Sequence, residues 1–359
     1  MHTEKIQTNL GSYRVHVASG LRFNINQLIE KEYKRILLIT DSTVDKLYAD
    51  DISKGFDEAV DILKYVVPSG EASKNIEEYY RLLTYSIENN MDRHSLIIAL
   101  GGGMIGDLSG FVASTFMRGI DFIQVPTTIL AHDSSVGGKV AINHPEGKNL
   151  IGSFYPPVAV VYDVDTLHSL PSHEIRSGYA EVIKHGFIAN GDLLKDVLHL
   201  DIKNEIENTQ LIRHLCDGIK VKANIVEKDE KESSIRKFLN FGHTLGHAIE
   251  SEMGYGNLTH GEAVAIGMLF ALEISEEKFN VDLFSSDYQA WMDFNHYPIK
   301  IGKLNLSHLI KRMKKDKKAK HAIVQMVLLE NIGKPILVDF TDEELSAYLD
   351  KFLRKLGSN

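Results

Sequence analysis

The alternation of strand-like and helix-like segments in the first half of the chain is the feature that most restricts its fold. Short apolar runs that end in polar or glycine residues indicate buried strands, and residues 75–90 carry apolar side chains at helical spacing. Strands separated by helices predict a mainly parallel sheet with helices on both faces. The expected strands cover residues 35–40, 65–67, 96–100, 122–125 and 158–162.

The pattern changes after Asp165, where long amphipathic helices begin to dominate. A chain of 359 residues is long enough for about two domains. We therefore expect an α/β Rossmann-like nucleotide-binding domain over residues 1–165 and a mainly α-helical metal- and substrate-binding domain over residues 166–359, with the active site in the cleft between them. The expected helices of the second domain cover residues 172–188, 207–228, 240–253 and 261–279, and a short strand pair covers residues 323–329 and 335–338.

Charge and composition exclude several classes of protein. The chain has 40 Lys and Arg against 49 Asp and Glu, a net charge of −9, which gives no general attraction to nucleic acid or to an anionic membrane. No apolar run approaches the roughly 20 residues of a membrane helix, and the polar first 20 residues show no signal peptide. The single cysteine, Cys216, cannot form an intrachain disulfide. We expect a cytoplasmic protein.

A glycine-rich turn is the candidate nucleotide site. The sequence Gly-Gly-Gly-Met-Ile-Gly-Asp at residues 101–107 follows an expected strand, and a helical pattern begins near Leu108. Glycines let the backbone approach a pyrophosphate, whose charge is attracted by the free amides of a helix N-terminus. Tight turns without a ligand have similar glycines, so this alternative stays open. Asp41 and Glu71 follow expected strands and could accept hydrogen bonds from ribose hydroxyls, or be ordinary loop acids.

Three histidines and a glutamate form the candidate metal site. His243 and His247 are four residues apart on an expected helix and share a face, His260 precedes the next helix, and Glu181 could add a carboxylate. Two imidazoles and a carboxylate leave coordination positions open, as in a catalytic zinc site. Thr244 stands where a metalloprotease would have its general-base glutamate, which weakens that interpretation. Spacing does not say which histidines bind, and histidines without a metal are the alternative.

Residues 133–143 and 147–149 form the candidate anion site. They are rich in small residues, amides and lysines, and too poor in apolar residues for a core strand. We expect a loop whose backbone and lysines hold an anion, and a flexible surface loop is the alternative. Four further cations interrupt apolar patterns, although each also fits a helix surface: Arg118, Lys184, Lys222 and Arg236.

As a set, these segments resemble the 3-dehydroquinate synthases, a family of sugar phosphate cyclases. The shared motifs follow the family's order at close to its spacing, from about residue 41 to residue 320. One departure is that residues 129–132 are one fewer than in the commoner family version, and this shortening falls directly before Asp133. The motifs are residues 101–107, 117–120, 125–128, 133–139, 147–149, 180–184, 240–247 and 260–262.

The resemblance implies a role for individual residues. The metal ligands would be Glu181, His243 and His260, and His247 would belong to the substrate site. The cofactor contacts would be Asp41, Ser69, Gly70, Glu71, Lys74, Gly103, Met104, Ile105, Gly106, Asp107, Thr127, Thr128, Lys139, Lys148, Thr166, Leu167, His168 and Ser169. The substrate contacts would be Arg118, Asp133, Lys139, Lys148, Asn149, Lys184, Lys222, Arg236, Asn240, His247 and one lysine of the 317–318 pair, here taken as Lys318. The catalytic set would be Lys139, Lys184, Asn149, His247, Arg236 and Glu232.

The resemblance also implies a reaction. The family converts 3-deoxy-D-arabino-heptulosonate 7-phosphate to 3-dehydroquinate and phosphate in the shikimate pathway of aromatic amino acid biosynthesis. Bound NAD oxidises C5 transiently, a divalent ion (zinc or cobalt) holds the substrate, and the enzyme, a carbon–oxygen lyase, is a homodimer. The leaving phosphate can itself remove the proton in the elimination step, so the reaction requires no protein base. The alternatives are another sugar phosphate cyclase, a metal- and NAD-dependent polyol dehydrogenase, and a nucleotide-binding module that has lost catalysis.

Overall fold

The computed structural model of the protein describes residues 1–254, 257–302, 304–316 and 323–357. They divide into two compact units: unit 1 comprises residues 1–170 and 207–230, and unit 2 comprises residues 171–206 and 231–359. This division differs from the single boundary expected near residue 166, because α7 (Asn208–Lys228) packs on β1 (His2–Thr8) and belongs to unit 1. Amphipathic spacing shows that a helix buries one face, but not which layer covers that face.

Unit 1 is built on a seven-stranded sheet with the order β1-β2-β9-β6-β5-β3-β4. All neighbouring strands are parallel except β1 and β2, which form an antiparallel hairpin at one edge. The mainly parallel sheet is confirmed, and the hairpin is an addition that the polar N-terminal sequence did not reveal. The remaining strands are β2 (Gly11–Ala18), β3 (Arg35–Asp41), β4 (Asp61–Val67), β5 (Leu96–Gly101), β6 (Asp121–Pro126) and β9 (Ala159–Asp163).

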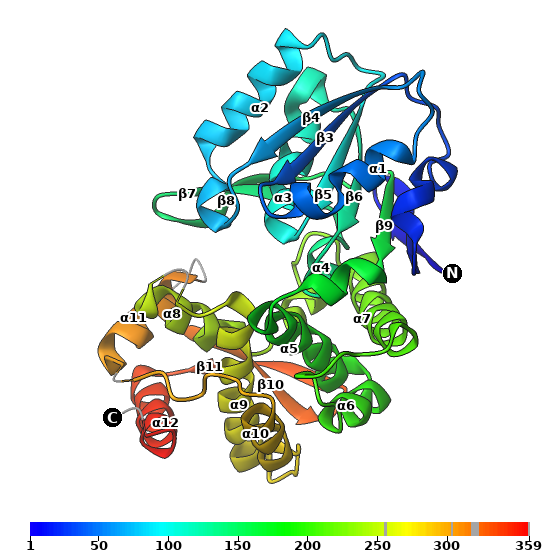
Figure 1. The fold of residues 1–359 in the computed structure, drawn as a ribbon. Coiled ribbons are helices and arrows are strands. Elements are labelled where there is room, and N and C mark those ends of the chain that lie inside the picture. The colour runs from blue at the N-terminus through cyan, green and yellow to red at the C-terminus, as the bar shows by residue number, and fades with distance from the viewer. Residues whose placement is uncertain (255–256, 303, 317–322, 358–359) are drawn as a thin grey trace. The chain divides into compact units, whose positions relative to one another are not determined.

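Both faces of this sheet are covered (Figure 1). Leu37 and Ile39 of β3 pack into one core with α3 (Gly103–Thr115), and the alternate residues Ile36 and Leu38 pack into a second core on the other face. Side chains alternate along a strand, so one apolar run supplies two cores. Unit 1 also contains η1 (Leu21–Leu28), η2 (Asp45–Ala49), α1 (Asp50–Lys54), η3 (Glu71–Ser73), α2 (Ile76–Glu88), η4 (Phe116–Arg118), α4 (Ala131–Ser134) and η5 (Val164–Ser169).

The expected anion-binding loop is a hairpin, so that backbone prediction was wrong. Strands β7 (Lys139–His144) and β8 (Gly147–Phe154) pair antiparallel. Val140 and Ile142 are buried in the core that also contains α3. These two apolar residues are flanked by polar and small ones. The overall composition of the segment therefore predicts a loop, although its alternation is that of a strand.

Unit 2 contains mostly helices, with a two-stranded antiparallel hairpin. Helix α9 is buried on almost every side, which explains its continuous apolar sequence. Among the described residues, none of the helices combines the length and the apolar character that crossing a membrane requires. The elements are α5 (Ser172–Ala189), α6 (Gly191–Leu198), η6 (Ile235–Asn240), α8 (His243–Met253), α9 (His260–Phe279), α10 (Ser285–Phe294), α11 (Leu306–Asp316), β10 (Val324–Asn331), β11 (Lys334–Phe340) and α12 (Asp342–Lys355).

Candidate functional site

The glycine turn of unit 1 leads directly into α3, which begins at Gly103 and not near residue 108 as expected. Its N-cap, Gly102, supplies no side chain to the amides of the first turn, which have no partner inside the helix. A β-carbon on Gly102 would lie 3.0 Å from the Thr128 side chain, and one on Gly103 would lie 3.0 Å from the Ser134 hydroxyl. The turn is therefore closely packed, and its amide end suits an anion.

Lys74 connects the predicted cofactor residues next to this turn. Its ammonium donates to the Asp107 carboxylate at 2.5 Å and to the Asn149 amide oxygen at 2.6 Å, and its side chain is almost fully buried. Burial raises the pKa of the Asp107 carboxyl, against the opposing effect of Lys74. Glu71 accepts from the Asn143 amide at 2.8 Å. The structure thus brings a lysine, two carboxylates and two amides together beside α3.

Asp41, at the end of β3, also stabilises its own loop. One carboxylate oxygen accepts from the backbone amides of Thr43 at 2.8 Å and Val44 at 3.2 Å, and from the Ser69 hydroxyl at 2.8 Å. The contact joins two predicted cofactor residues, Asp41 and Ser69, which lie on the loops that follow β3 and β4. The same contacts fit an ordinary loop acid, so the role of Asp41 stays a prediction.

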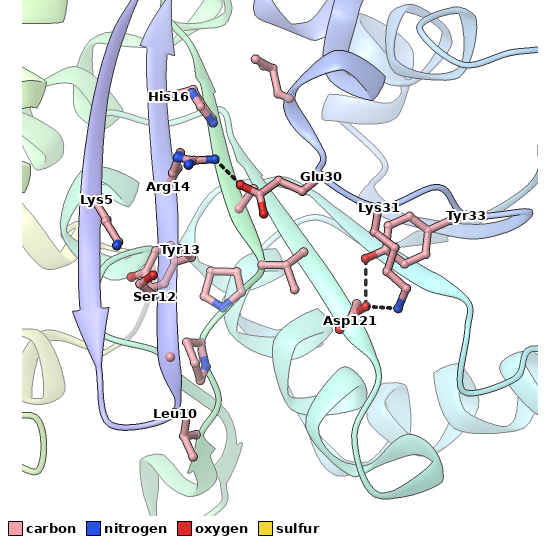
Figure 2. Close-up of a pocket in the computed structure, with 16 residues that line it drawn as sticks. Lys5, Leu10, Ser12, Tyr13, Arg14, His16, Glu30, Lys31, Tyr33 and Asp121 are labelled. Carbon is pink, nitrogen blue, oxygen red and sulfur yellow. Dashed lines mark hydrogen bonds and ion pairs between the residues drawn. The ribbon is translucent and has the colours of Figure 1, made fainter.

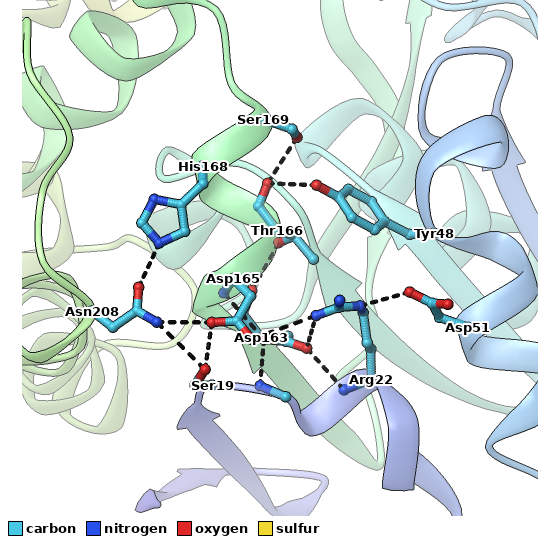
Figure 3. Close-up of polar contacts among 11 residues, drawn as sticks. Ser19, Arg22, Tyr48, Asp51, Asp163, Asp165, Thr166, His168, Ser169 and Asn208 are labelled. Carbon is cyan, nitrogen blue, oxygen red and sulfur yellow. Dashed lines mark hydrogen bonds and ion pairs between the residues drawn. The ribbon is translucent and has the colours of Figure 1, made fainter.

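Predicted cofactor residues 166–169 lie on η5, whose N-cap residue is Asp163 (Figure 3). Hydrogen bonds to the Asp163 side chain hold the start of this segment. This carboxylate is fully buried and accepts from the backbone amides of Gly20 at 2.9 Å, Arg22 at 3.1 Å and Asp165 at 3.1 Å. The Arg22 guanidinium adds a charge-assisted bond at 2.8 Å. A buried carboxylate needs several donors of this kind, and here they lock the start of η5 in place.

The remainder of η5 is held by neighbouring side chains. The Thr166 carbonyl accepts from the Tyr48 hydroxyl at 3.2 Å and from the Ser169 hydroxyl at 2.9 Å. His168 donates to the Asn208 side chain at 2.6 Å, and Asn208 lies at the start of α7. Leu167 is buried, so the accessible predicted contacts of this segment are mainly polar.

Two of the predicted substrate residues in unit 1 contact each other. The Lys222 ammonium, on α7, lies 3.2 Å from the Asp133 carboxylate and also donates to the Asp133 backbone carbonyl. Lys139 is exposed at the start of β7, and Lys148 is half-buried in β8. Arg118 is exposed, with a φ of 70° that a non-glycine residue adopts only at a cost.

The metal candidates of unit 2 converge on Glu181. Its Oε1 atom lies 3.5 Å from the Nε2 atom of His243 and 3.7 Å from that of His260. This oxygen is buried and has no hydrogen-bond partner among the described residues, whereas the other carboxylate oxygen accepts from Lys184. A buried carboxylate oxygen without a partner is costly, unless something that the described atoms do not include compensates it.

A divalent cation fits this arrangement. Ligand atoms that share a tetrahedral ion at about 2.1 Å lie roughly 3.4 Å apart, which is close to both measured separations. Burial, and then the charge of Lys184, hold the pKa of His243 well below its usual value, so its ring is neutral. The His243 Nδ1 atom donates to the Phe241 carbonyl at 3.2 Å, which leaves the Nε2 lone pair directed at Glu181.

A second possible set of metal ligands includes His247 in place of Glu181. The donor atoms of His243, His247 and His260 all lie within 4.8 Å of one another, so a three-histidine site is geometrically accessible. The Glu181 Oε1 atom accepts no hydrogen bond within the described part of the chain and lies close to two imidazole nitrogens, which favours the glutamate set. We therefore keep His247 as a predicted substrate residue.

Close helix packing explains why the sequence brings these groups together. A β-carbon on Gly261, at the start of α9, would lie 2.0 Å from the Ser177 carbonyl of α5. One on Gly242 would lie 2.4 Å from Met268 of α9, and its φ of 80° also favours glycine. Gly242 is the N-cap residue of α8, so this helix begins at His243 and not at residue 240 as expected. Thr259 forms a capping box at the start of α9, which fixes the backbone of His260.

The other predicted residues of unit 2 lie on η6 or just before it. Arg236 is fully buried on η6, and Asn240 donates from its side chain to the Glu232 carboxylate at 2.8 Å. Glu232 has a φ of 59°, an uncommon conformation for this residue type. Lys318, like its neighbour Lys317, lies outside the described residues.

Two carboxylates of these networks were not found from the sequence. Asp163 anchors η5, and Glu250 approaches the Nδ1 atom of His260 at 3.4 Å. The sequence spacing could have predicted that Glu250 lies near the histidines. It follows His243 by seven residues and His247 by three, so it shares their helix face. No local sequence pattern predicts the role of Asp163, because most of its hydrogen-bond partners lie far away in the sequence.

A separate cavity of about 460 Å³ lies beside β1 and β2 (Figure 2). Two ion pairs line it: Arg14 contacts Glu30, and Lys31 donates to Asp121 at 2.8 Å. No predicted site residue that the structure describes lines this cavity. We therefore do not assign the anionic substrate to it.

Comparison with known proteins decides the family. A family model described as 3-dehydroquinate synthase N-terminal matches residues 64–177, and one described as 3-dehydroquinate synthase C-terminal matches residues 178–319. A 3-dehydroquinate synthase from Oceanobacillus iheyensis is 51% identical over 99% of both chains. Another, from Bacillus pumilus, is 47% identical, again over 99% of both chains. The chain belongs to the 3-dehydroquinate synthase family.

Solved structures confirm the expected fold of an α/β domain followed by a helical domain. A 2-deoxy-scyllo-inosose synthase complexed with carbaglucose-6-phosphate, NAD⁺ and Co²⁺ is 26% identical, with a TM-score of 0.86 over 98% of this chain and 99% of that chain. A 2-epi-5-epi-valiolone synthase from Streptomyces hygroscopicus subsp. jinggangensis, with NAD⁺ and Zn²⁺ bound, shares the fold with a TM-score of 0.86 at 22% identity, over 97% of this chain and 99% of that chain. A probable glycerol dehydrogenase from Sinorhizobium meliloti has a TM-score of 0.62 at 16% identity, over 96% and 97%. The fold is thus more similar to these two cyclases than to this dehydrogenase.

Proposed function

We propose that the protein is a 3-dehydroquinate synthase that converts 3-deoxy-D-arabino-heptulosonate 7-phosphate to 3-dehydroquinate and phosphate. The observation that carries the proposal is the buried Glu181 Oε1 atom, which accepts no hydrogen bond from the described residues and faces two imidazole nitrogens, in a chain of this family. A carboxylate and two histidines leave room on a divalent ion for substrate oxygens.

The proposed cofactors are NAD and a zinc or cobalt ion. When bound, NAD would accept a hydride from C5 of the substrate and return it, and the ion would polarise the C4 and C5 oxygens. Glu181, His243 and His260 would hold the ion. The 2-deoxy-scyllo-inosose synthase with NAD⁺ and Co²⁺ bound supports both assignments.

In unit 1, we assign the N-terminus of α3 to the NAD pyrophosphate, because its first amides have no partner inside the helix. Lys74 would keep Asp107 and Asn149 in place beside it. Asp41 and Glu71 would accept from ribose hydroxyls with the carboxylate oxygens that remain accessible. The exposed Lys139 would provide cationic charge for phosphate in a protein whose net charge is −9.

In unit 2, Lys184 would neutralise the second oxygen of Glu181 and donate to a substrate oxygen. Arg236 would hold the C1 carboxylate with its planar fork of donors. Charge-assisted bonds of this kind contribute about 1.5–3 kcal/mol each, so several are needed to offset desolvation of a doubly anionic substrate. Glu232 would orient Asn240 toward the substrate. His247 would donate a hydrogen bond to the substrate. The departing phosphate would take the proton itself, so the proposal needs no protein base.

The proposal extends to class, assembly and pathway. The enzyme would be a carbon–oxygen lyase that depends on NAD and a divalent metal, and would act as a cytoplasmic homodimer in the shikimate pathway. Strand β1 lies at the edge of the described seven-stranded sheet, and an edge strand is a common place for a second copy to pair. Light scattering during size-exclusion chromatography would measure the mass of the assembly.

Two rival functions differ from this one in their products. Another sugar phosphate cyclase would act on a sugar without a C1 carboxylate and would not need Arg236. A polyol dehydrogenase would accumulate NADH and would have little use for Lys139 and Lys148. The relatives that are 47% and 51% identical are both 3-dehydroquinate synthases, which favours the heptulosonate phosphate.

The test is a phosphate-release assay with NAD and zinc or cobalt. We expect phosphate from the heptulosonate phosphate, no net NADH, and loss of activity after EDTA treatment with recovery on adding metal. A hexose 6-phosphate, which has no carboxylate, is the matched control. Equal phosphate release from the hexose would favour another cyclase, and steady NADH accumulation would favour the dehydrogenase.

A further inference from the structure

We propose that Glu250 is a positioning residue for the metal site, acting through His260. The inference rests on the proposed function, since it takes Glu181, His243 and His260 as the ligands. It assigns to Glu250 the task of holding the His260 ring so that its Nε2 atom faces Glu181. Glu250 itself would not touch the metal or the substrate.

The two nitrogens of the His260 ring face two different carboxylates. Nε2 lies 3.7 Å from Glu181, and Nδ1 lies 3.4 Å from the Oε2 atom of Glu250. Glu250 comes from α8 and Glu181 from α5, while His260 is the first residue of α9. The ring is therefore held between side chains from two other helices.

The position of Glu250 on α8 follows from helix geometry. His243, His247 and Glu250 occupy positions i, i+4 and i+7, so they lie on one face of the helix. The Glu250 side chain is only 7% exposed, although a carboxylate normally remains in water. A buried carboxylate next to an imidazole N–H is a recurring partner of a metal-binding histidine.

The contact sets the tautomer of His260. A carboxylate accepts and cannot donate, so Nδ1 carries the proton and Nε2 carries the lone pair that a cation would bind. His243 reaches the same tautomer through the Phe241 carbonyl. Both rings thus present Nε2 to the buried Glu181 oxygen, one held by the backbone and the other by a side chain.

His260 has more need of such a partner than His243. The His260 side chain is 34% exposed, compared with 12% for His243. A more exposed ring has more room to rotate, and rotation would direct Nε2 away from the ion. The carboxylate also increases the basicity of Nε2 and strengthens its bond to a metal.

The experiment measures metal binding by the apoprotein, without catalysis. We compare Glu250→Ala, Glu250→Gln and the control Glu252→Gln by competition for Zn²⁺ with a chromophoric chelator, and record the visible spectra of the Co²⁺-loaded proteins. Glu252 is on the same helix but pairs with Arg312 and His308, so its variant makes the same charge change without touching a proposed metal ligand.

We expect Glu250→Ala to weaken Zn²⁺ binding by about 10- to 100-fold and to change the Co²⁺ spectrum. Glu250→Gln should lose less, because an amide oxygen still accepts from Nδ1, and it tests the proposal even if the alanine variant does not fold. Glu252→Gln should bind like the unmodified protein. In a His260→Ala background, Glu250→Ala should have no further effect.

Unchanged Zn²⁺ affinity and an unchanged Co²⁺ spectrum in both Glu250 variants would overturn the inference while leaving the proposed function intact. An equal loss in Glu252→Gln, or a full additional loss in the His260→Ala background, would also overturn it. If the unmodified protein bound neither Zn²⁺ nor Co²⁺, the proposed metal site itself would fail, and this inference with it.

Discussion

The ammonium of Lys74 lies 2.5 Å from the carboxylate of Asp107, and both side chains are largely withdrawn from solvent. Burial raises the pKa of Asp107, and the Lys74 charge opposes that rise. The two groups therefore depend on each other. If the lysine were removed, a partly buried carboxylate would lose its counter-charge next to the N-terminus of α3.

We predict that Lys74→Met lowers the free energy of unfolding by about 3 kcal/mol at pH 8 and weakens NAD binding. A carboxyl group whose folded pKa is raised destabilises the fold when it ionises, and the penalty decreases as the pH falls toward its unfolded pKa. The deficit of Lys74→Met should therefore be smaller at pH 5 than at pH 8. Urea unfolding at the two pH values measures this difference.

The control for this prediction is Lys64→Met. Lys64 pairs with Asp45 at 2.8 Å on the surface of the same unit, and its side chain is 42% exposed. Exposed pairs contribute about 0–1 kcal/mol, so this variant should be almost neutral at both pH values. A Lys74→Met deficit that is no larger than that of Lys64→Met, or that grows on acidification, would contradict the prediction.

The metal ligands give the second prediction. Glu181→Gln, His243→Ala and His260→Ala should each raise the dissociation constant for Zn²⁺ by at least ~100-fold, since each removes a bond to the ion, whereas His247→Ala should change it by less than about tenfold. Chelator competition at constant pH measures all four. If His247→Ala lost as much affinity as the others and Glu181→Gln lost little, the three-histidine set would be the metal site.

The parts of the fold that follow from local patterns were predictable. The strand of residues 35–40 contains a continuous apolar run at residues 36–39, and such a run between helices is typical of a buried parallel strand. The hairpin formed by β7 and β8 was missed because its buried residues, Val140 and Ile142, stand in a segment rich in small residues, amides and lysines, a composition typical of loops. The N-terminal hairpin was missed because β1 has few apolar residues and is an edge strand.

The candidate site divides in the same way. His243 and His247 share a helix face by spacing alone, so their proximity was predictable. That Glu181 joins His243 and His260 depends on how closely α5 and α8 approach α9, which side-chain contacts between helices determine. No local pattern contains that information, and the resemblance to a family supplied it.

The third prediction concerns the hydrogen bonds that Asp163 accepts at the start of η5. Asp163→Asn replaces an acceptor of four hydrogen bonds with an amide whose nitrogen must face donors. We expect a loss of about 3 kcal/mol in the free energy of unfolding. If residues 166–169 contact NAD as predicted, nucleotide affinity should fall as well. Equilibrium denaturation and NAD titration followed by fluorescence measure the two effects.

Asp51→Asn is the matched control for the network. Asp51 accepts from the same arginine, Arg22, at 2.9 Å, but its side chain is 29% exposed, and among the described residues it forms no hydrogen bond or ion pair with η5. We expect it to cost about 1 kcal/mol without changing NAD affinity. Equal effects of the two substitutions on NAD binding would show that Asp163 does not act through η5.

The last prediction concerns Cys216 on α7. Burial, and then the neighbouring Asp217, raise the pKa of its thiol to about 12. Only the thiolate reacts, and at pH 8 such a group is ionised in roughly one molecule in ten thousand. The native protein should therefore react with a thiol reagent such as DTNB far more slowly than a free cysteine does. In guanidinium chloride it should release one equivalent of chromophore per chain at once, since the sequence has a single cysteine. A native rate equal to that of free cysteine would mean that α7 opens on the timescale of the assay, and the packing described for this helix would then be wrong.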